Sequence, residues 1–166
     1  LAPVQPSIDS LLLQAALLTH LPPAIFVFVL GACVGSFINV VNYRLPRRMP
    51  LMTPPSSCPS CGHRLKFFRE NLPILGWVFL KGKCAYCKVK ISREYPVIEL
   101  CTALLFLLLY VLCYWVPTST PFLGEVFGQW WHANGIFRTF PSFVALCAMF
   151  SGLLAMTVID ARTYTI

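Results

Sequence analysis

Four cysteines stand in two CxxC pairs, Cys58–Cys61 and Cys84–Cys87, with 22 residues between the pairs. Two thiolates in a tight knuckle can bind one side of a tetrahedral ion, and a second knuckle binds the other side. The spacing is close to that of four-cysteine zinc sites, so it predicts a structural Zn²⁺ bound by Cys58, Cys61, Cys84 and Cys87. Disulfides, a dithiol redox pair or an iron–sulfur centre are the alternatives on spacing alone.

Two acids lie in or beside apolar segments. Glu99 falls inside an apolar window, where a carboxylate is unfavourable unless it is functional or partnered, for instance by a loop arginine. Asp160 ends a later apolar window, where it is either functional or paired with the nearby Arg162. Asn39 and Asn42 share one face of a predicted helix, so they serve either a contact between helices or the substrate.

The elements that must position these groups are membrane helices. The chain has 166 residues, of which 57% are hydrophobic and 11% charged, whereas about 25% is typical of soluble domains. Three windows, 24–41, 97–116 and 140–159, approach or reach the ~20 apolar residues that cross a bilayer. We therefore predict an all-α polytopic membrane protein with three transmembrane helices and a small cytoplasmic four-cysteine zinc lobe.

The distribution of charge predicts the topology. Eleven of the 13 Lys and Arg residues lie between Arg44 and Arg93, which places this loop in the cytoplasm by the positive-inside rule. A reducing cytosol favours metal-bound thiolates over disulfides. Because topology accounts for the charge, we expect no nucleic-acid partner, and we expect the basic loop to lie against anionic membrane lipid.

The predicted division of the chain follows from these spans. It comprises an outer-side segment at 1–22, a transmembrane helix at 23–43, a cytoplasmic zinc-binding loop domain at 44–95, a second transmembrane helix at 96–116, an outer-side loop at 117–139, a third transmembrane helix at 140–160, and the start of the next cytoplasmic loop at 161–166.

Several motifs together resemble one family, the type 4 prepilin leader peptidases. Residues 35–40 (GSFINV) with 44–46 (RLP) are similar to its first-span signature. The four-cysteine loop resembles that of the family, as do residues 70–77 (ENLPILGW), residues 94–99 (EYPVIE) and the third-span ending at Asp160. The resemblance runs from about residue 31 to residue 166.

This resemblance implies an integral inner-membrane aspartic peptidase. Members cleave the short basic leader of prepilins and pseudopilins at the cytoplasmic face, after a glycine. Those with the cysteine loop are typically bifunctional and also N-methylate the new N-terminal residue with S-adenosylmethionine. Asp160 matches the first of the two catalytic aspartates of the family. The methyl-donor site has no recognisable motif, and Glu99 and the zinc lobe are candidates by position.

The second aspartate of the family lies in a Gly-x-Gly-Asp motif on a later span, and this motif does not occur in residues 1–166. A two-carboxylate mechanism needs one ionised and one protonated acid in proximity. We therefore expect this chain to be the N-terminal part of a longer enzyme, to need the C-terminal helices of the same protein as partners, and to be inactive alone as a peptidase.

Two other functions compete with this interpretation. A non-enzymatic zinc-bearing membrane adaptor would use the basic lobe to bind cytoplasmic partners. A membrane thiol oxidoreductase would use one CxxC pair, but two pairs at metal spacing in a cytoplasmic loop favour zinc.

Overall fold

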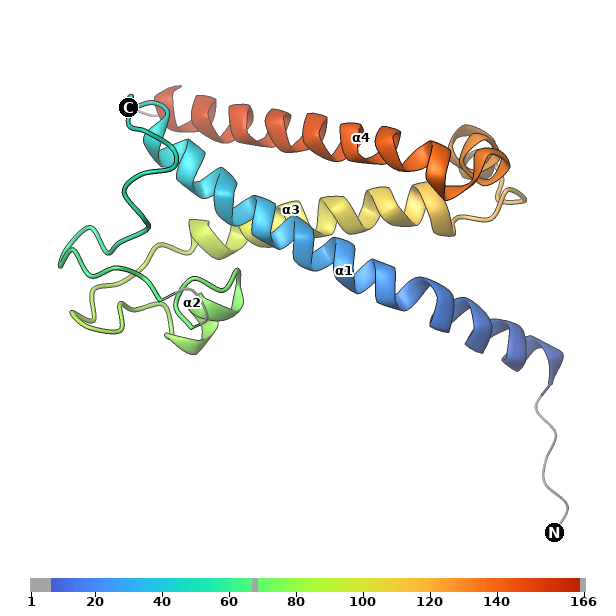
Figure 1. Cartoon of the computed structure of the whole chain (residues 1–166), viewed down its shortest axis with the longest axis horizontal. Helices are drawn as coiled ribbons and strands as arrows, with labels where there is room; N and C mark the ends of the chain where they lie inside the picture. The colour runs from blue at the N-terminus through green and yellow to red at the C-terminus, as the bar shows by residue number, and fades with distance from the viewer. Residues whose placement is uncertain (1–6, 67–68, 165–166) are drawn as a thin grey trace, which may run out of the picture.

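The computed structural model describes residues 7–66 and 69–164, and its regular structure is helical (Figure 1). The elements are α1 (Ile8–Arg44), α2 (Leu75–Phe79), α3 (Glu94–Tyr110), the π-helical turns η1 (Val111–Trp115) and η2 (Gly124–Gly128), and α4 (Gln129–Tyr164). Within these described ranges there is no strand, only two isolated bridges, Ser57 with Arg64 and Lys83 with Lys90. The predicted all-α class is confirmed.

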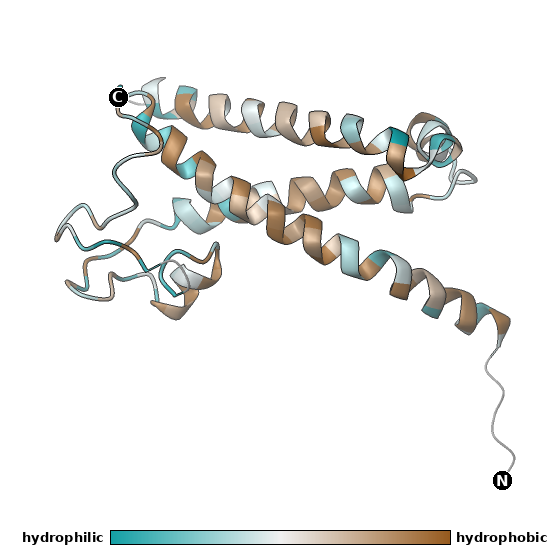
Figure 2. Ribbon diagram, viewed as in Figure 1, coloured by the Kyte–Doolittle hydropathy of each residue, from teal (hydrophilic) through white to brown (hydrophobic). Residues whose placement is uncertain are grey.

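Three helical segments are long and apolar enough to cross a bilayer: 8–44, 94–115 and 124–163. Figure 2 shows these helices mostly brown, whereas the lobe between α1 and α3 mixes teal and brown. This arrangement confirms the prediction of three long apolar helices with a small lobe between the first two.

Helix α1 is one continuous helix. The Ser7 side chain caps it by accepting a hydrogen bond from the Ser10 N–H, and the helix then passes through Pro22 and Pro23 to Arg44. Its 37 residues measure about 55 Å at 1.5 Å per residue. The sequence suggested a separate segment at 1–22, but from Ile8 onward its residues form the first part of the same helix, because proline is tolerated within apolar helices of this kind.

Helices α1 and α3 approach each other closely at two glycines. A Cβ atom on Gly35 would lie 2.7 Å from the Cα of Glu99, and one on Gly31 would lie 2.8 Å from the Cα of Ala103. Real side chains do not fit at these distances, so only glycine permits this separation. Such small residues let helix backbones come together in lipid, and here they bring the Asn39 face of α1 against the start of α3.

Replacing Gly35 by alanine is expected to destabilise the α1–α3 pair by about 1–3 kcal/mol, the usual effect of overfilling a tight interface. Gly152→Ala is the matched control, because a Cβ at Gly152 would meet nothing within 4 Å. Unfolding in mixed detergent micelles would measure both variants. Equal stability of the two would contradict the close helix approach.

The core lies at the end of the bundle away from the lobe. There α3 and η1 pack on α1 and on α4, which is broken at Gly135 by a φ of 69°. The Tyr114 hydroxyl hydrogen-bonds the Thr139 hydroxyl at 3.2 Å across this junction. The packed side chains are Ala24, Val27, Phe106, Leu109, Tyr110, Cys113, Trp131, Phe143 and Cys147.

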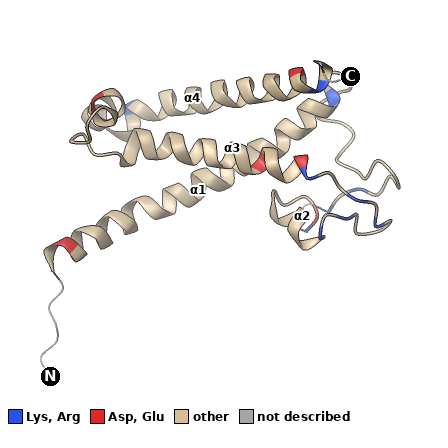
Figure 3. Cartoon of the chain, turned by 180° about the vertical axis from the view of Figure 1, so that it is seen from behind, with Lys and Arg blue, Asp and Glu red and all other residues tan. Residues whose placement is uncertain are grey.

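The opposite end of the bundle gathers the lobe and the ends of three helices. Figures 1 and 3 both show the C-terminal ends of α1 and α4 and the first turns of α3 at the lobe end, where Lys and Arg are concentrated. The Arg162 guanidinium lies 2.6 Å from the Glu94 carboxylate and joins the end of α4 to the start of α3. The candidate functional residues of the sequence therefore share one end of the molecule.

Candidate functional site

The four cysteine sulfurs form one cluster. The Sγ atoms of Cys58 and Cys87 are 3.8 Å apart, those of Cys61 and Cys84 are 4.0 Å apart, and all four lie within 4.8 Å of one another. A tetrahedral Zn²⁺ with Zn–S bonds of about 2.3 Å requires S···S distances of about 3.8 Å. A disulfide would require about 2.05 Å. The donor set therefore fits a four-coordinate metal ion.

The two knuckles have the same internal structure. In loops 57–64 and 83–90, the first cysteine donates its N–H to the carbonyl five residues later, at 2.9 Å in both loops, and accepts an N–H from four residues later. The residue in that fourth position has a positive φ in each loop, 69° at Gly62 and 60° at Lys88. Each half of the metal site is thus held by its own turn, which presents both sulfurs to the same point.

The knuckle backbone also favours thiolates. The N–H groups of Tyr86 and Cys87 lower the pKa of Cys84 to about 7, and N–H groups within the other knuckle lower the pKa of Cys58. The Val89 N–H acts in the same direction on Cys87, but burial and the neighbouring sulfurs outweigh it and raise the pKa of Cys87 to about 11. A bound cation would allow all four thiolates to coexist.

His63 lies beside the cluster and not in it. Its Nε2 is 3.5 Å from a carboxylate oxygen of Glu70, and its ring packs against Tyr86 with the centroids 3.5 Å apart. The Glu70 carboxylate also accepts the backbone N–H of Lys66 at 3.1 Å. The contact of His63 with Glu70 therefore supports the loop between the knuckles.

Glu99 joins the lobe to the helices. It is 8% exposed, its carboxylate accepts the Ile74 N–H at 2.6 Å, and the Ser36 hydroxyl lies beside the same carboxylate. Sequence reasoning offered a loop arginine as a partner, whereas the contacts in the described part of the chain are a backbone amide and a hydroxyl. The partner was missed because a backbone N–H leaves no sequence signal.

Ile74, whose N–H donates to Glu99, has an unusual backbone conformation. Its φ of 61° and ψ of −56°, with the Leu75 N–H donated to the Pro73 carbonyl, define the rarer and strained form of the γ-turn. A β-branched residue at positive φ is unfavourable. The carboxylate of Glu99 therefore helps to hold the strained turn that begins α2.

Replacing Glu99 by alanine is expected to release this turn, because the Ile74 N–H would lose a buried acceptor worth about 1–3 kcal/mol. Amide hydrogen exchange over residues 72–80 should accelerate, whereas Glu99→Gln, which keeps an oxygen acceptor, should stay closer to wild type. Adding Ile74→Gly to Glu99→Ala should restore much of the protection, since glycine adopts a φ of 61° without strain. Unchanged exchange in Glu99→Ala would contradict this role.

The polar residues at the end of α1 have separate partners. Asn39 donates to the Tyr95 carbonyl at 3.1 Å, which is a contact between helices. Asn42 is 1% exposed, and its amide has no hydrogen-bond partner within the described ranges. Arg44 is buried and donates to the carbonyls of Pro50, Leu51 and Pro54. The guanidinium thus folds the first part of the loop back onto the helix end.

Asp160 is exposed in the last turns of α4. Beside its turn lies a cleft of about 320 Å³ between the start of α3 and the end of α4. The cleft is lined by Glu94, Val97, Ile98, Thr157, Val158, Ala161 and Arg162. The structure thus brings Asp160 to the same end as the cysteine cluster and Glu99, with an accessible carboxylate.

This fold and this site define a helical membrane protein with a lobe between its first two spans that gathers four cysteines able to hold a metal ion. Comparison with known families gives a match to the bacterial peptidase A24 N-terminal domain over residues 29–113. The chain belongs to this family. No solved structure matches it.

Similar curated proteins are named prepilin leader peptidase/N-methyltransferase. The protein of Myxococcus xanthus is 52% identical over 83 residues, which are 50% of this chain and 24% of the relative. Those of Pseudomonas aeruginosa and Dickeya chrysanthemi are 33% and 39% identical over 80% and 81% of this chain, and over 45% and 47% of their own lengths. The chain therefore spans 24% to 47% of the length of these relatives.

Proposed function

We propose that the intact protein cleaves the leader peptide of type 4 prepilins and pseudopilins and then N-methylates the new N-terminal residue with S-adenosylmethionine. The observation that carries this proposal is the family match across residues 29–113, together with relatives of that name that are similar over four-fifths of the chain. The protein would act in the bacterial inner membrane, with the cysteine loop in the cytoplasm, and would serve type IV pili or type II secretion.

In the proposed cleavage, Asp160 is one of two aspartates. The ionised carboxylate takes a proton from water as the water attacks the scissile carbonyl, and the protonated carboxyl donates to the carbonyl oxygen. The second aspartate would come from outside residues 1–166. The exposure of Asp160 at the helix end supports this role, because water and an extended peptide must both reach it.

The metal in this proposal is a structural Zn²⁺ bound by Cys58, Cys61, Cys84 and Cys87. Four thiolates fill a tetrahedral shell, and a catalytic zinc keeps one position open for water. The ion would fix the shape of the lobe by joining its two knuckles. The groups that carry out cleavage would therefore lie outside the metal site, at this same end of the bundle.

Glu99 remains our candidate for the methylation half of the reaction, through positioning. Its carboxylate is engaged by the Ile74 N–H, so it would act by fixing the lobe against α3. A Glu99→Gln enzyme that keeps normal cleavage and methylation would rule out pairing of the negative charge of Glu99 with the prepilin amine. A Glu99→Ala enzyme that keeps both activities would rule out the positioning role as well.

The experiment that tests the proposal uses the full-length protein and residues 1–166 in membranes with a purified prepilin. Mass spectrometry would follow loss of the leader and gain of one methyl group from S-adenosylmethionine. We expect both reactions with the full-length protein and no cleavage with residues 1–166. An intact prepilin in the presence of a folded, metal-bound full-length protein would instead favour the adaptor function.

A further inference from the structure

Helix α2 lies alongside the first turns of α3. It does not lie in front of the residue at which α3 begins. Ile74, directly before α2, donates its N–H to Glu99, which is five residues after the start of α3 at Glu94. Five residues correspond to about 7.5 Å along a helix. Figures 1 and 3, seen from opposite sides, both show α2 alongside this part of α3. If α3 crosses the bilayer, α2 lies at the depth of the membrane interface.

The face of α2 that points away from the lobe is apolar. Leu75, Val78 and Phe79 are three and four residues apart, hence on one side of the helix, and are 51%, 52% and 63% exposed. The other side is packed on the lobe. A Cβ on Gly76 would lie 2.7 Å from the Glu70 carbonyl oxygen, and the Trp77 indole donates to the Ile91 carbonyl. The apolar side is therefore fixed outward.

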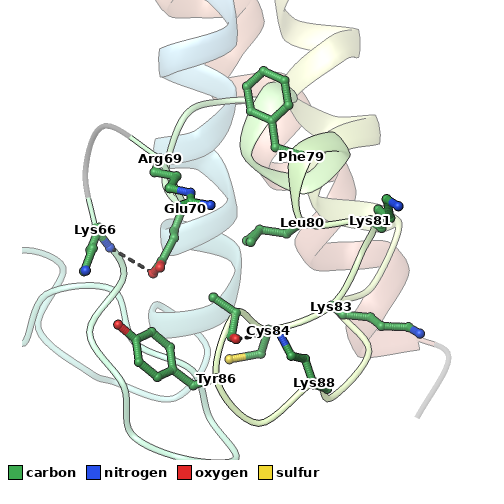
Figure 4. Close-up of a pocket in the computed structure, with 11 residues that line it drawn as sticks. Lys66, Arg69, Glu70, Phe79, Leu80, Lys81, Lys83, Cys84, Tyr86 and Lys88 are labelled. Atoms are coloured by element: carbon green, nitrogen blue, oxygen red, sulfur yellow. Dashed lines mark hydrogen bonds between the residues drawn. The ribbon is translucent and has the colours of Figure 1, made fainter.

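A basic cleft of about 560 Å³ adjoins this face, and Phe79 and Leu80 contribute to its wall (Figure 4). The charged residues that line the cleft are Lys66, Arg69, Lys81, Lys83, Lys88 and Glu70. The Glu70 carboxylate offsets one of these five positive charges, and Cys84 of the cysteine cluster also lines the cleft. No ion pair involves the five cations in the part of the chain that the structure describes. The cleft therefore suits an anion with an apolar neighbour.

We propose that α2 inserts its Leu75, Val78 and Phe79 face into the membrane interface, and that the basic cleft binds the phosphate groups of anionic phospholipids there. An apolar helix face normally inserts about 5–10 Å into the boundary between headgroups and acyl chains, which agrees with the depth of the Ile74–Glu99 contact. Lysines next to this boundary attract an anionic leaflet. The assignment does not depend on the peptidase activity.

Phospholipid is favoured over other anions by the combination of groups. A soluble phosphate would use the lysines but leave the apolar side of α2 in water. A soluble protein partner would have to reach this side at the depth of Glu99, alongside a membrane helix. An anionic lipid supplies a phosphate to the cleft and a hydrocarbon environment to α2 at the same time.

The test uses the full-length protein in nanodiscs of phosphatidylcholine that contain a small fraction of photoactivatable phosphatidylglycerol or photoactivatable phosphatidylcholine. Crosslinked residues are mapped by mass spectrometry. We expect the phosphatidylglycerol probe to label residues 75–88 more strongly than the phosphatidylcholine probe. Each Lys→Gln change at Lys66, Lys83 or Lys88 should lower this preference by up to about fivefold, the effect of one basic residue at an anionic surface.

Two controls make the result specific. Lys90 is an exposed lysine of the same lobe that does not line the cleft, so Lys90→Gln should keep the preference. Phe79→Ser should reduce labelling of α2, whereas Met52→Ser, at another exposed apolar residue of the lobe, should not. Equal labelling of wild type by the two probes would overturn the proposal. Loss of the preference in excess inorganic phosphate would instead indicate a site for soluble anions and would also overturn it.

Discussion

Asp160→Asn in the full-length protein is expected to lower the rate of leader cleavage by about 10²–10⁴-fold, the usual contribution of a general acid or base. Asparagine keeps the size of the side chain but cannot hold or move a proton. Because Asp160 is exposed in the last turns of α4, the substitution should leave folding intact, since surface changes have small effects on stability. The measurement is the initial rate of leader loss from a purified prepilin.

The matched control is Asp9→Asn. Asp9 is also an exposed aspartate near a helix end, but it lies in the first turn of α1, at the opposite end of the bundle. This variant should cleave at the wild-type rate. Methylation of an already cleaved pilin by Asp160→Asn should also continue, because the proposed role of the carboxylate is confined to cleavage. Normal cleavage by Asp160→Asn would rule out Asp160 as a reacting group.

Cys58→Ser is expected to lower bound zinc from one ion per chain to well below one and to unfold the lobe. Structural zinc sites of this kind have apparent binding free energies of about 10–16 kcal/mol, more than a lobe of this size can replace by burying apolar surface. Metal analysis would give the stoichiometry, and hydrogen exchange over loops 57–64 and 83–90 would report the unfolding. The helical circular dichroism should change little, since α1 and α3 pack through their glycines.

Cys33→Ser is the control for this prediction. Cys33 is an exposed cysteine on α1, without a partner cysteine at ligand spacing, so its loss should leave zinc and lobe protection unchanged. Chelation of the wild-type protein should reproduce the effect of Cys58→Ser and free four thiols. Retention of a full zinc equivalent by Cys58→Ser, or isolation of the wild type with disulfides in place of free thiols, would contradict the metal site.

The sequence predicted the long helices and the cysteine cluster because both depend on strong local signals. An apolar window has few alternatives to a membrane helix, and two CxxC pairs carry their own turn geometry. The cluster of Cys58, Cys61, Cys84 and Cys87 within 4.8 Å is the arrangement that the spacing predicted. The continuity of α1 through Pro22 was harder to foresee, because the same residues permit a break.

The links between lobe and helices could not be predicted. The Glu99 contact depends on the backbone N–H of Ile74, which has a φ of 61°. An isoleucine in the sequence gives no indication of a positive φ. Arg44 illustrates the same limit, because its buried guanidinium donates hydrogen bonds to three backbone carbonyl groups and, among the residues that the structure describes, does not pair with an acid. Asp160 was found from its place at the end of an apolar window, and its catalytic role remains a proposal.

The order of the ligands along the chain has a consequence for biosynthesis. All four cysteines precede α3, which begins at Glu94, so the lobe can acquire its metal once Cys87 has left the ribosome. The acceptor Glu99 leaves the ribosome only after 12 more residues have been added, at about 5–20 residues per second. Metal loading can therefore precede insertion of the second span, and the nascent lobe would already be shaped when that span arrives and the Ile74 amide meets its carboxylate.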